Sequence, residues 1–175
     1  MNEIIISRIL ATVVICLLIA CGGLIFSLSK SESTVLKTFI QKYAHVLTLI
    51  IAISATLGSL YYSEIANFVP CDYCWYQRIA MYPITILMAT SLLTKNSLSS
   101  LYLIILAGLG LLISIYHYQL QLFPEQSNFC SAVVPCQSKW VEEFGFVSIP
   151  FMAASSFLAI LTLQFILMKF DKKNQ

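Results

Sequence analysis

Long apolar runs alternate with shorter polar stretches along the whole chain. A helix that crosses the hydrocarbon core of a membrane needs about 20 mainly apolar residues. Five stretches meet that requirement, and they cover Ile9–Leu28, His45–Tyr62, Trp75–Leu93, Leu101–Tyr118 and Ser148–Met168. None of them shows the strict alternation of apolar and polar residues that a membrane β-barrel requires. The pattern therefore predicts an all-α, polytopic membrane protein.

The composition supports this prediction. Apolar residues make up 59% of the chain, charged residues only 10%, and the mean hydropathy is +0.85. Soluble globular domains carry about 25% charged residues, so there is too little charge here to cover a surface that faces water. An ordinary soluble domain and a disordered chain are both excluded, and the net charge of +2 argues against a nucleic-acid-binding protein.

The lysines predict the orientation of the helices. Seven of the ten basic residues fall in three places that must share one membrane face, namely Lys30, Lys37, Lys42, Lys95, Lys169, Lys172 and Lys173. The connection 63–74 contains no Lys or Arg, and 119–147 contains only Lys139. The positive-inside rule places the lysine-rich face and the C-terminus in the cytoplasm. Both lysine-poor connections and the N-terminus are then expected outside.

The first apolar run allows two interpretations. The sequence Leu18–Cys21 resembles a lipoprotein cleavage site, which would make the run a signal peptide. The preceding segment contains Glu3 and only Arg8, a weak positive region for such a signal, so we favour a retained spanning helix. Cys16 and Cys21 lie about 140° apart on this helix, and we expect them to act as small apolar side chains.

Four further cysteines lie in the two connections predicted to be outside. Cys71 and Cys74 form a C-x-x-C motif, and Cys130 and Cys136 form a C-x5-C pair. Each pair is compatible with a structural disulfide, with half of a four-cysteine zinc site, or with redox catalysis. The irregular second spacing and the separate loops argue against zinc, so we predict no metal. The spacing alone leaves the structural and the redox interpretations open.

Arg78 lies four residues after Cys74, one helical turn deeper on the same face if the helix begins at Cys74. A guanidinium at the membrane edge is costly unless it faces protein, headgroups or a polar ligand. It would stabilise a Cys74 thiolate, together with the amide groups of the helix N-terminus. The alternative is an arginine that reaches the headgroups beside an aromatic belt of Trp75, Tyr76 and Tyr82.

Around these residues the sequence resembles a known family. The runs Leu57–Ile65 and Pro70–Pro83, the latter containing C-D-Y-C-W-Y-Q-R, are similar to the DsbB family of membrane disulfide-forming proteins, in particular its short BdbC-type branch. The likeness continues through Ile115–Tyr118, Val134–Cys136 and Phe144–Phe151. The resemblance implies a four-helix transmembrane bundle over 45–170. An extra N-terminal transmembrane helix with a lysine-containing cytoplasmic connection (1–44) precedes it, and a cytoplasmic tail (171–175) follows.

The resemblance also implies an activity, that of a thiol:quinone oxidoreductase of the bacterial cell (inner) membrane. Cys130 would exchange with a DsbA-like thiol oxidase, soluble or membrane-anchored, and Cys136 would resolve the mixed disulfide. Electrons would pass to Cys71 and Cys74, and Cys74 would pass them to menaquinone or ubiquinone. Such a protein supports disulfide formation in exported proteins.

Arg78 and His117 would lie near the carbonyl oxygens of the quinone. Without the resemblance, the favoured interpretation of His117 is a hydrogen-bonded histidine at the membrane interface. Larger members of the family carry Glu where this chain has Gln77, so we assign Gln77 no proton-transfer role. The competing function is a non-catalytic membrane subunit whose loops are held by two structural disulfides. A third function, a thiol reductase that moves electrons inward, would use cysteines within helices, such as Cys16 and Cys21.

Overall fold

The computed structural model describes residues 2–30, 34–96, 98–124 and 135–173, and these residues are mostly helical. The elements are α1 (Asn2–Lys30), α2 (Thr34–Leu60), the π-helical turn η1 (Tyr61–Ile65), α3 (Asp72–Thr94), α4 (Ser100–Leu122) and α5 (Ile149–Lys173). Within this described part the only β-type pairing is an isolated bridge between Glu143 and Val147. The all-α fold class predicted from the sequence is confirmed.

The protein is a multi-pass membrane protein. Among the described helices, four are long and apolar enough to cross a membrane, namely α1, α2 with η1, α4 and α5. The sequence predicted a fifth span at Trp75–Leu93, and a helix does form there, but it does not reach the same mean hydropathy. Gln77 and Arg78 lie in its second turn and are buried. Because α3 packs against both α2 and α4, these polar side chains face protein rather than lipid.

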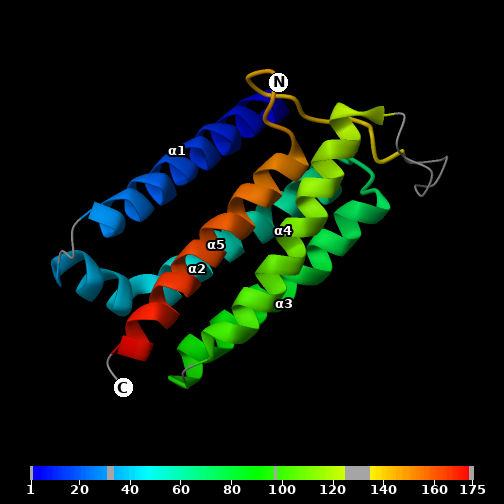
Figure 1. The fold of residues 1–175 in the computed structure, drawn as a ribbon. Coiled ribbons are helices and arrows are strands. Elements are labelled where there is room, and N and C mark those ends of the chain that lie inside the picture. The colour runs from blue at the N-terminus through cyan, green and yellow to red at the C-terminus, as the bar shows by residue number, and fades with distance from the viewer. Residues whose placement is uncertain (1, 31–33, 97, 125–134, 174–175) are drawn as a thin grey trace.

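The helices α2 to α5 form the bundle, and α1 lies outside it along α5 (Figure 1). The strongest packing is between α4 and α5, followed by α2 with α5 and α3 with its two neighbours. The N-terminal end of α1, the connection between α2 and α3, and the described part of the connection between α4 and α5 lie at one end of the bundle (Figure 1). The C-terminus and the short turn between α3 and α4, which contains Lys95, lie at the other end.

The core of the bundle is apolar, with a few polar contacts between helices. Phe157 is fully buried, and its ring lies so close to Gly110 that any side chain at position 110 would collide with it. Gln164 donates a hydrogen bond of 2.7 Å to the hydroxyl of Thr48, which joins α5 to α2. In lipid, small residues allow close helix packing and such polar contacts link helices where water is absent.

Two polar contacts near the N-terminus of α1 attach this helix to the rest of the protein. The hydroxyl of Tyr62 donates a buried hydrogen bond of 3.2 Å to Ser7, and Arg8 forms an ion pair of 3.3 Å with Glu143 in the connection before α5. Cys16 is exposed and Cys21 is buried, and both carry free thiols. The extra N-terminal helix predicted from the sequence is therefore part of the fold and contacts the second cysteine-bearing connection.

α2 begins well before the apolar run predicted from His45. Lys37 and Lys42, which the sequence analysis placed in a connection, are helical residues of α2. The reason is an apolar face with a spacing of four residues. Ile40 and Ala44 on this face are fully buried against Leu167 of α5. Tertiary packing thus extends a helix through a stretch whose average polarity suggested a loop.

Candidate functional site

Cys71 and Cys74 lie where α3 begins. Cys71 is the N-cap residue, with an extended backbone (φ −75°, ψ 173°), and its carbonyl accepts a hydrogen bond of 3.2 Å from the amide of Trp75. Cys74 lies one turn into the helix, so the C-x-x-C spacing brings both side chains to the same side. Their Sγ atoms are 3.0 Å apart, and both carry free thiols. The pair is in its dithiol form, with its sulfur atoms in contact but about 1 Å further apart than in a disulfide bond.

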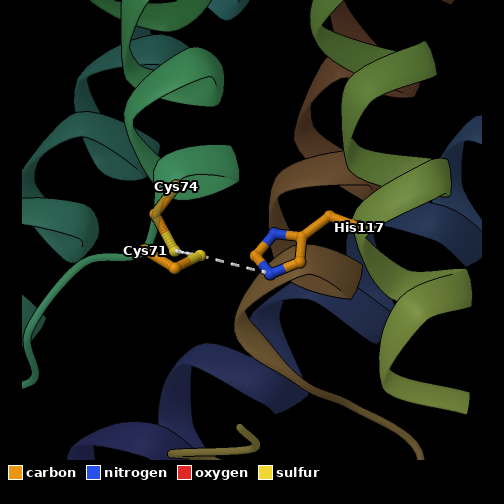
Figure 2. Close-up of side chains that lie close together, drawn as sticks. All are labelled: Cys71, Cys74 and His117. Carbon is orange, nitrogen blue, oxygen red and sulfur yellow. Dashed lines mark hydrogen bonds between the residues drawn. The ribbon is translucent and has the colours of Figure 1, made fainter. Parts of the chain in front are cut away.

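His117 from α4 completes a buried cluster with this pair (Figure 2). Its Nε2 lies 3.5 Å from the Sγ of Cys71 and 3.2 Å from the carbonyl oxygen of Cys136. Its Nδ1 lies 3.2 Å from the amide nitrogen of Gln77. An amide NH2 can only donate, so Nδ1 accepts and the proton is on Nε2. That proton is shared between the Cys71 sulfur and the Cys136 carbonyl.

These contacts stabilise a thiolate on Cys71. Its pKa is lowered to about 4, mainly because Cys74 donates a hydrogen bond to its sulfur, with a further contribution from His117. Burial acts in the opposite direction and is outweighed. The same hydrogen bond raises the pKa of Cys74, which lies in the first turn of α3 before the apolar run begins at Trp75. The pair therefore shares one proton, with the negative charge on Cys71.

The sequence analysis placed the stabilised thiolate on Cys74, beside Arg78. In the dithiol form the structure differs, because Arg78 has only a minor lowering effect on the pKa of Cys74. The stronger influences are the hydrogen bond between the two cysteines and the contact of Cys71 with His117. That second contact joins residues 46 positions apart and is invisible to an argument from local spacing.

Arg78 is buried and is held by α2. Its Nε donates a hydrogen bond of 2.9 Å to the hydroxyl of Ser59, and its Nη2 donates one of 3.1 Å to the Ser59 carbonyl. Its guanidinium also lies 5.0 Å from the centre of the Trp75 ring. Two of its five N–H groups thus contact Ser59 in the described part of the chain. Sequence analysis missed Ser59, although it lies in the Leu57–Ile65 run that resembles DsbB.

The second cysteine pair is described only in part, because Cys130 lies outside the described residues. Cys136 forms a disulfide, is buried, and packs in one cluster with Cys71, Cys74 and Leu120. A cavity of about 20 Å³ lies between these elements, and it is lined by Cys71, Cys74, His117, Gln121, Pro135, Ser138, Trp140, Ile149 and Pro150. This volume holds about one water molecule. It is far too small for a quinone ring.

The three clustered side chains also form a potential set of metal ligands. The Sγ atoms of Cys71 and Cys74 and a ring nitrogen of His117 all lie within 4.8 Å of one another. This set differs from the four-cysteine site that the sequence analysis considered and rejected. It combines one cysteine pair with a histidine from another helix.

Comparisons with known proteins agree with this arrangement. Residues 41–167 match the family model described as disulfide bond formation protein DsbB. A probable disulfide formation protein of Oceanobacillus iheyensis is 43% identical over 136 residues, covering 74% of this chain and 94% of the relative. The probable disulfide formation protein C 2 of Bacillus anthracis is 40% identical over 139 residues, covering 79% of this chain and 99% of the relative.

The disulfide bond formation protein C of Bacillus subtilis is 40% identical over 114 residues, covering 64% of this chain and 83% of the relative. No solved structure matches the chain significantly. α1 falls outside the region matched by the family model, whereas the cluster of Cys71, Cys74 and His117 lies inside it. The family model matches most of this helical membrane bundle, including its C-x-x-C dithiol. The chain therefore belongs to the DsbB family of disulfide bond formation proteins.

Proposed function

We propose that the protein is a thiol:quinone oxidoreductase that reoxidises a DsbA-like thiol oxidase outside the bacterial cell membrane. One observation supports this function above the others. The Cys71–Cys74 dithiol, with its charge on Cys71, is packed against Cys136, which is itself in a disulfide. Two cysteine pairs in contact, one reduced and one oxidised, are suited to exchange two electrons by thiol–disulfide exchange.

The exchange between the pairs proceeds through Cys71 and Cys136. The Cys136 thiolate attacks the Sγ of Cys71 in the Cys71–Cys74 disulfide, and Cys74 leaves as a thiolate. Cys130 then attacks the Sγ of Cys136, which re-forms the Cys130–Cys136 disulfide and releases Cys71 as a thiolate. Two electrons have then moved to the first pair. The N–H of His117 stabilises the departing Cys71 sulfur, and a leaving thiol of low pKa leaves faster.

The partner supplies the electrons. By the resemblance to DsbB, a reduced DsbA-like oxidase presents a dithiol to Cys130, which forms a mixed disulfide that the partner's second thiol resolves. The partner leaves oxidised, and Cys130 and Cys136 are left as thiols. The cycle then continues with the exchange described above, so each turn moves one electron pair inward from the partner.

Arg78 is buried close to Cys74, and the exposed residues next to it on α3 offer a quinone a place from which one of its oxygens can reach the guanidinium. The small cavity excludes a ring, but Trp75 and Ile79 are 52% and 64% exposed on the outside of α3. The N–H groups of Arg78 that Ser59 does not use can bind a quinone oxygen and favour negative charge on it. A quinone, either menaquinone or ubiquinone, accepts two electrons and two protons. His117 faces Cys71 and Cys136, so we assign it to the exchange step.

The shared proton allows either cysteine of the first pair to be the thiolate. Transfer of the Cys74 proton across 3.0 Å to Cys71 leaves the negative charge on Cys74, where Arg78 partly offsets the rise in pKa that the hydrogen bond with Cys71 causes. Cys71 then serves the exchange with Cys136, and Cys74 serves the electron acceptor. The two roles agree with the positions of the cysteines, because Cys71 is the N-cap residue and Cys74 lies in the first turn of α3.

The lysines support the orientation of this chemistry in the membrane. The helix ends that carry most lysines meet at the end of the bundle opposite the cysteine-bearing connections (Figure 1). With the lysine-rich end in the cytoplasm, Cys71 and Cys136 face the exported proteins. The division into an N-terminal helix with its connection (1–44), the redox bundle (45–170) and a short cytoplasmic tail (171–175) stays a proposal, and its two boundaries fall within α2 and α5.

The function is tested by following quinone absorbance with purified protein, a reduced thioredoxin-like oxidase and either quinone. We expect turnover that requires Cys71, Cys74, Cys130 and Cys136, and that persists in a Cys16→Ala, Cys21→Ala control. Turnover that continues in Cys74→Ser would contradict the proposal. No turnover with either quinone, in protein shown to be folded, would favour the non-catalytic membrane subunit.

A further inference from the structure

Three atoms that can bind a metal ion lie within 4.8 Å of one another, namely the Sγ atoms of Cys71 and Cys74 at the start of α3 and a ring nitrogen of His117 on α4 (Figure 2). In a tetrahedral zinc site with bonds of about 2.3 Å to sulfur and 2.0–2.1 Å to nitrogen, a sulfur and a nitrogen ligand lie about 3.5 Å apart. The Sγ of Cys71 and the Nε2 of His117 are 3.5 Å apart. Two sulfur ligands would lie about 3.8 Å apart. The two cysteine sulfurs, at 3.0 Å, would therefore have to move apart by somewhat less than about 1 Å when the ion binds.

We propose that the reduced form of this cluster binds a thiophilic divalent cation of the zinc type through Cys71, Cys74 and His117, and that the bound ion stops the redox cycle. The inhibitory role rests on the redox cycling of Cys71 and Cys74 proposed above. When the pair is a disulfide, neither sulfur is a thiolate, and thiolates are the metal ligands. The metal site therefore exists only while Cys71 and Cys74 are in the reduced, dithiol form.

The charge and proton balance suit a buried site. Two thiolates neutralise the divalent ion, so the complex carries no net charge into the protein interior. The ion replaces the proton that the cysteines share, and the His117 proton moves from Nε2 to Nδ1. Gln77 then turns its amide so that its oxygen accepts from Nδ1, which supplies the partner that orients a metal-bound histidine. No electrons move in this step.

The adjoining cavity supplies the fourth position. Its volume of about 20 Å³ matches one water molecule, and Gln121 and Ser138 line it beside the three ligands. Three protein ligands with a water are typical of open zinc sites rather than of closed structural sites. An open, reversible site agrees with a bound ion that halts turnover and is removed by a chelator.

The test uses Co²⁺ as a spectroscopic probe on full-length protein that carries Cys16→Ala and Cys21→Ala, reduced with a phosphine and freed of metal. We expect thiolate-to-cobalt charge-transfer absorption that saturates at one ion per chain and is displaced by Zn²⁺. Cys71→Ser and Cys74→Ser should each abolish it. His117→Ala should weaken binding by at least about tenfold. Cys136→Ser, the matched control, should retain it because Cys136 is not a ligand.

The unsubstituted protein gives a second readout that does not depend on variants. Zn²⁺ should protect Cys71 and Cys74 from alkylation in the reduced protein and should lower quinone reduction until a chelator is added. Cobalt binding by the oxidised pair, equal binding in His117→Ala, or loss of binding in Cys136→Ser would overturn the inference. Quinone turnover without metal binding would refute the inference alone, and metal binding without quinone turnover would refute the proposed function alone.

Discussion

His117 holds Cys71 at 3.5 Å with a nitrogen whose proton also reaches the carbonyl oxygen of Cys136 at 3.2 Å. One histidine on α4 therefore contacts both cysteine-bearing connections at once. Because its other nitrogen contacts Gln77 of α3, its ring is fixed in orientation and tautomer. The contact of Cys71 with another helix is thus made by the buried histidine of α4, whereas Arg78 belongs to α3, the helix of Cys74 itself.

Cys71 should react as a thiolate over a wide pH range. With its pKa near 4, the thiolate is present above that pH and is lost only as the pH falls through that value. We expect its rate of alkylation by iodoacetamide in the reduced protein to be nearly constant from about pH 5.5 to 8. Cys74→Ala should raise the pKa most, and His117→Ala less. A rate that rises steadily towards pH 9 in the unsubstituted protein would contradict the assignment.

Arg78→Lys should impair quinone reduction, although the substitution keeps the positive charge. A lysine lacks the planar guanidinium that donates to both acceptors of Ser59 while it lies over the Trp75 ring. We expect the KM for quinone to rise at least about tenfold, while thiol exchange with the partner stays near normal. Ser59→Ala, which removes one of the two acceptors, is the matched variant and should have a smaller effect. Equal kinetics for Arg78→Lys and the unsubstituted protein would refute the role of the guanidinium.

Gly110→Ala should destabilise the bundle, because the added methyl group meets the Phe157 ring at the main helix interface. Overpacking of this kind costs about 1–3 kcal/mol of unfolding free energy. Gly108→Ala is the matched control on the same helix, since nothing lies within 4 Å of the added group. Thermal unfolding in detergent should show a lower Tm for the first variant only. A similar Tm for both would show that α4 and α5 are not packed this closely.

Tyr62→Phe should loosen α1 without affecting the chemistry. It removes the buried hydrogen bond to Ser7 and leaves the ring, which stacks on Phe68. Hydrogen bonds between membrane helices contribute about 0.6 kcal/mol on average and at most about 1.7 kcal/mol. We expect faster hydrogen exchange or proteolysis in the first turns of α1, with quinone reduction unchanged. The same exchange rates in Tyr62→Phe and the unsubstituted protein would argue that the ion pair between Arg8 and Glu143 is sufficient.

Much of the fold could be predicted from the sequence because membrane helices are recognised as long runs of apolar residues. The helical nature of every span was predicted, and so was the extra helix before the bundle. The boundary of α2 was not, because the packing of Ile40 against Leu167 involves residues far apart in the chain. Contacts between helices also explain why α3 can contain Gln77 and Arg78, since these side chains bond to His117 of α4 and Ser59 of α2.

The site was predictable in its residues and less so in its contacts. The C-x-x-C motif and the family resemblance identified Cys71, Cys74, Arg78 and His117 as candidates. They could not show that Arg78 contacts Ser59 or that His117 contacts Cys71, because helical periodicity relates only residues on the same helix. The position of the negative charge within the pair depends on these contacts between helices.

The redox state of Cys71 and Cys74 during turnover tests the central claim most directly. Samples are quenched with acid before and after quinone is added to protein and excess reduced partner, and the two thiols are then alkylated and quantified by mass spectrometry. We predict that the pair is reduced before quinone is added, becomes oxidised within one turnover, and returns to the dithiol when quinone is exhausted. A pair that stays in one state while quinone is consumed would contradict the account.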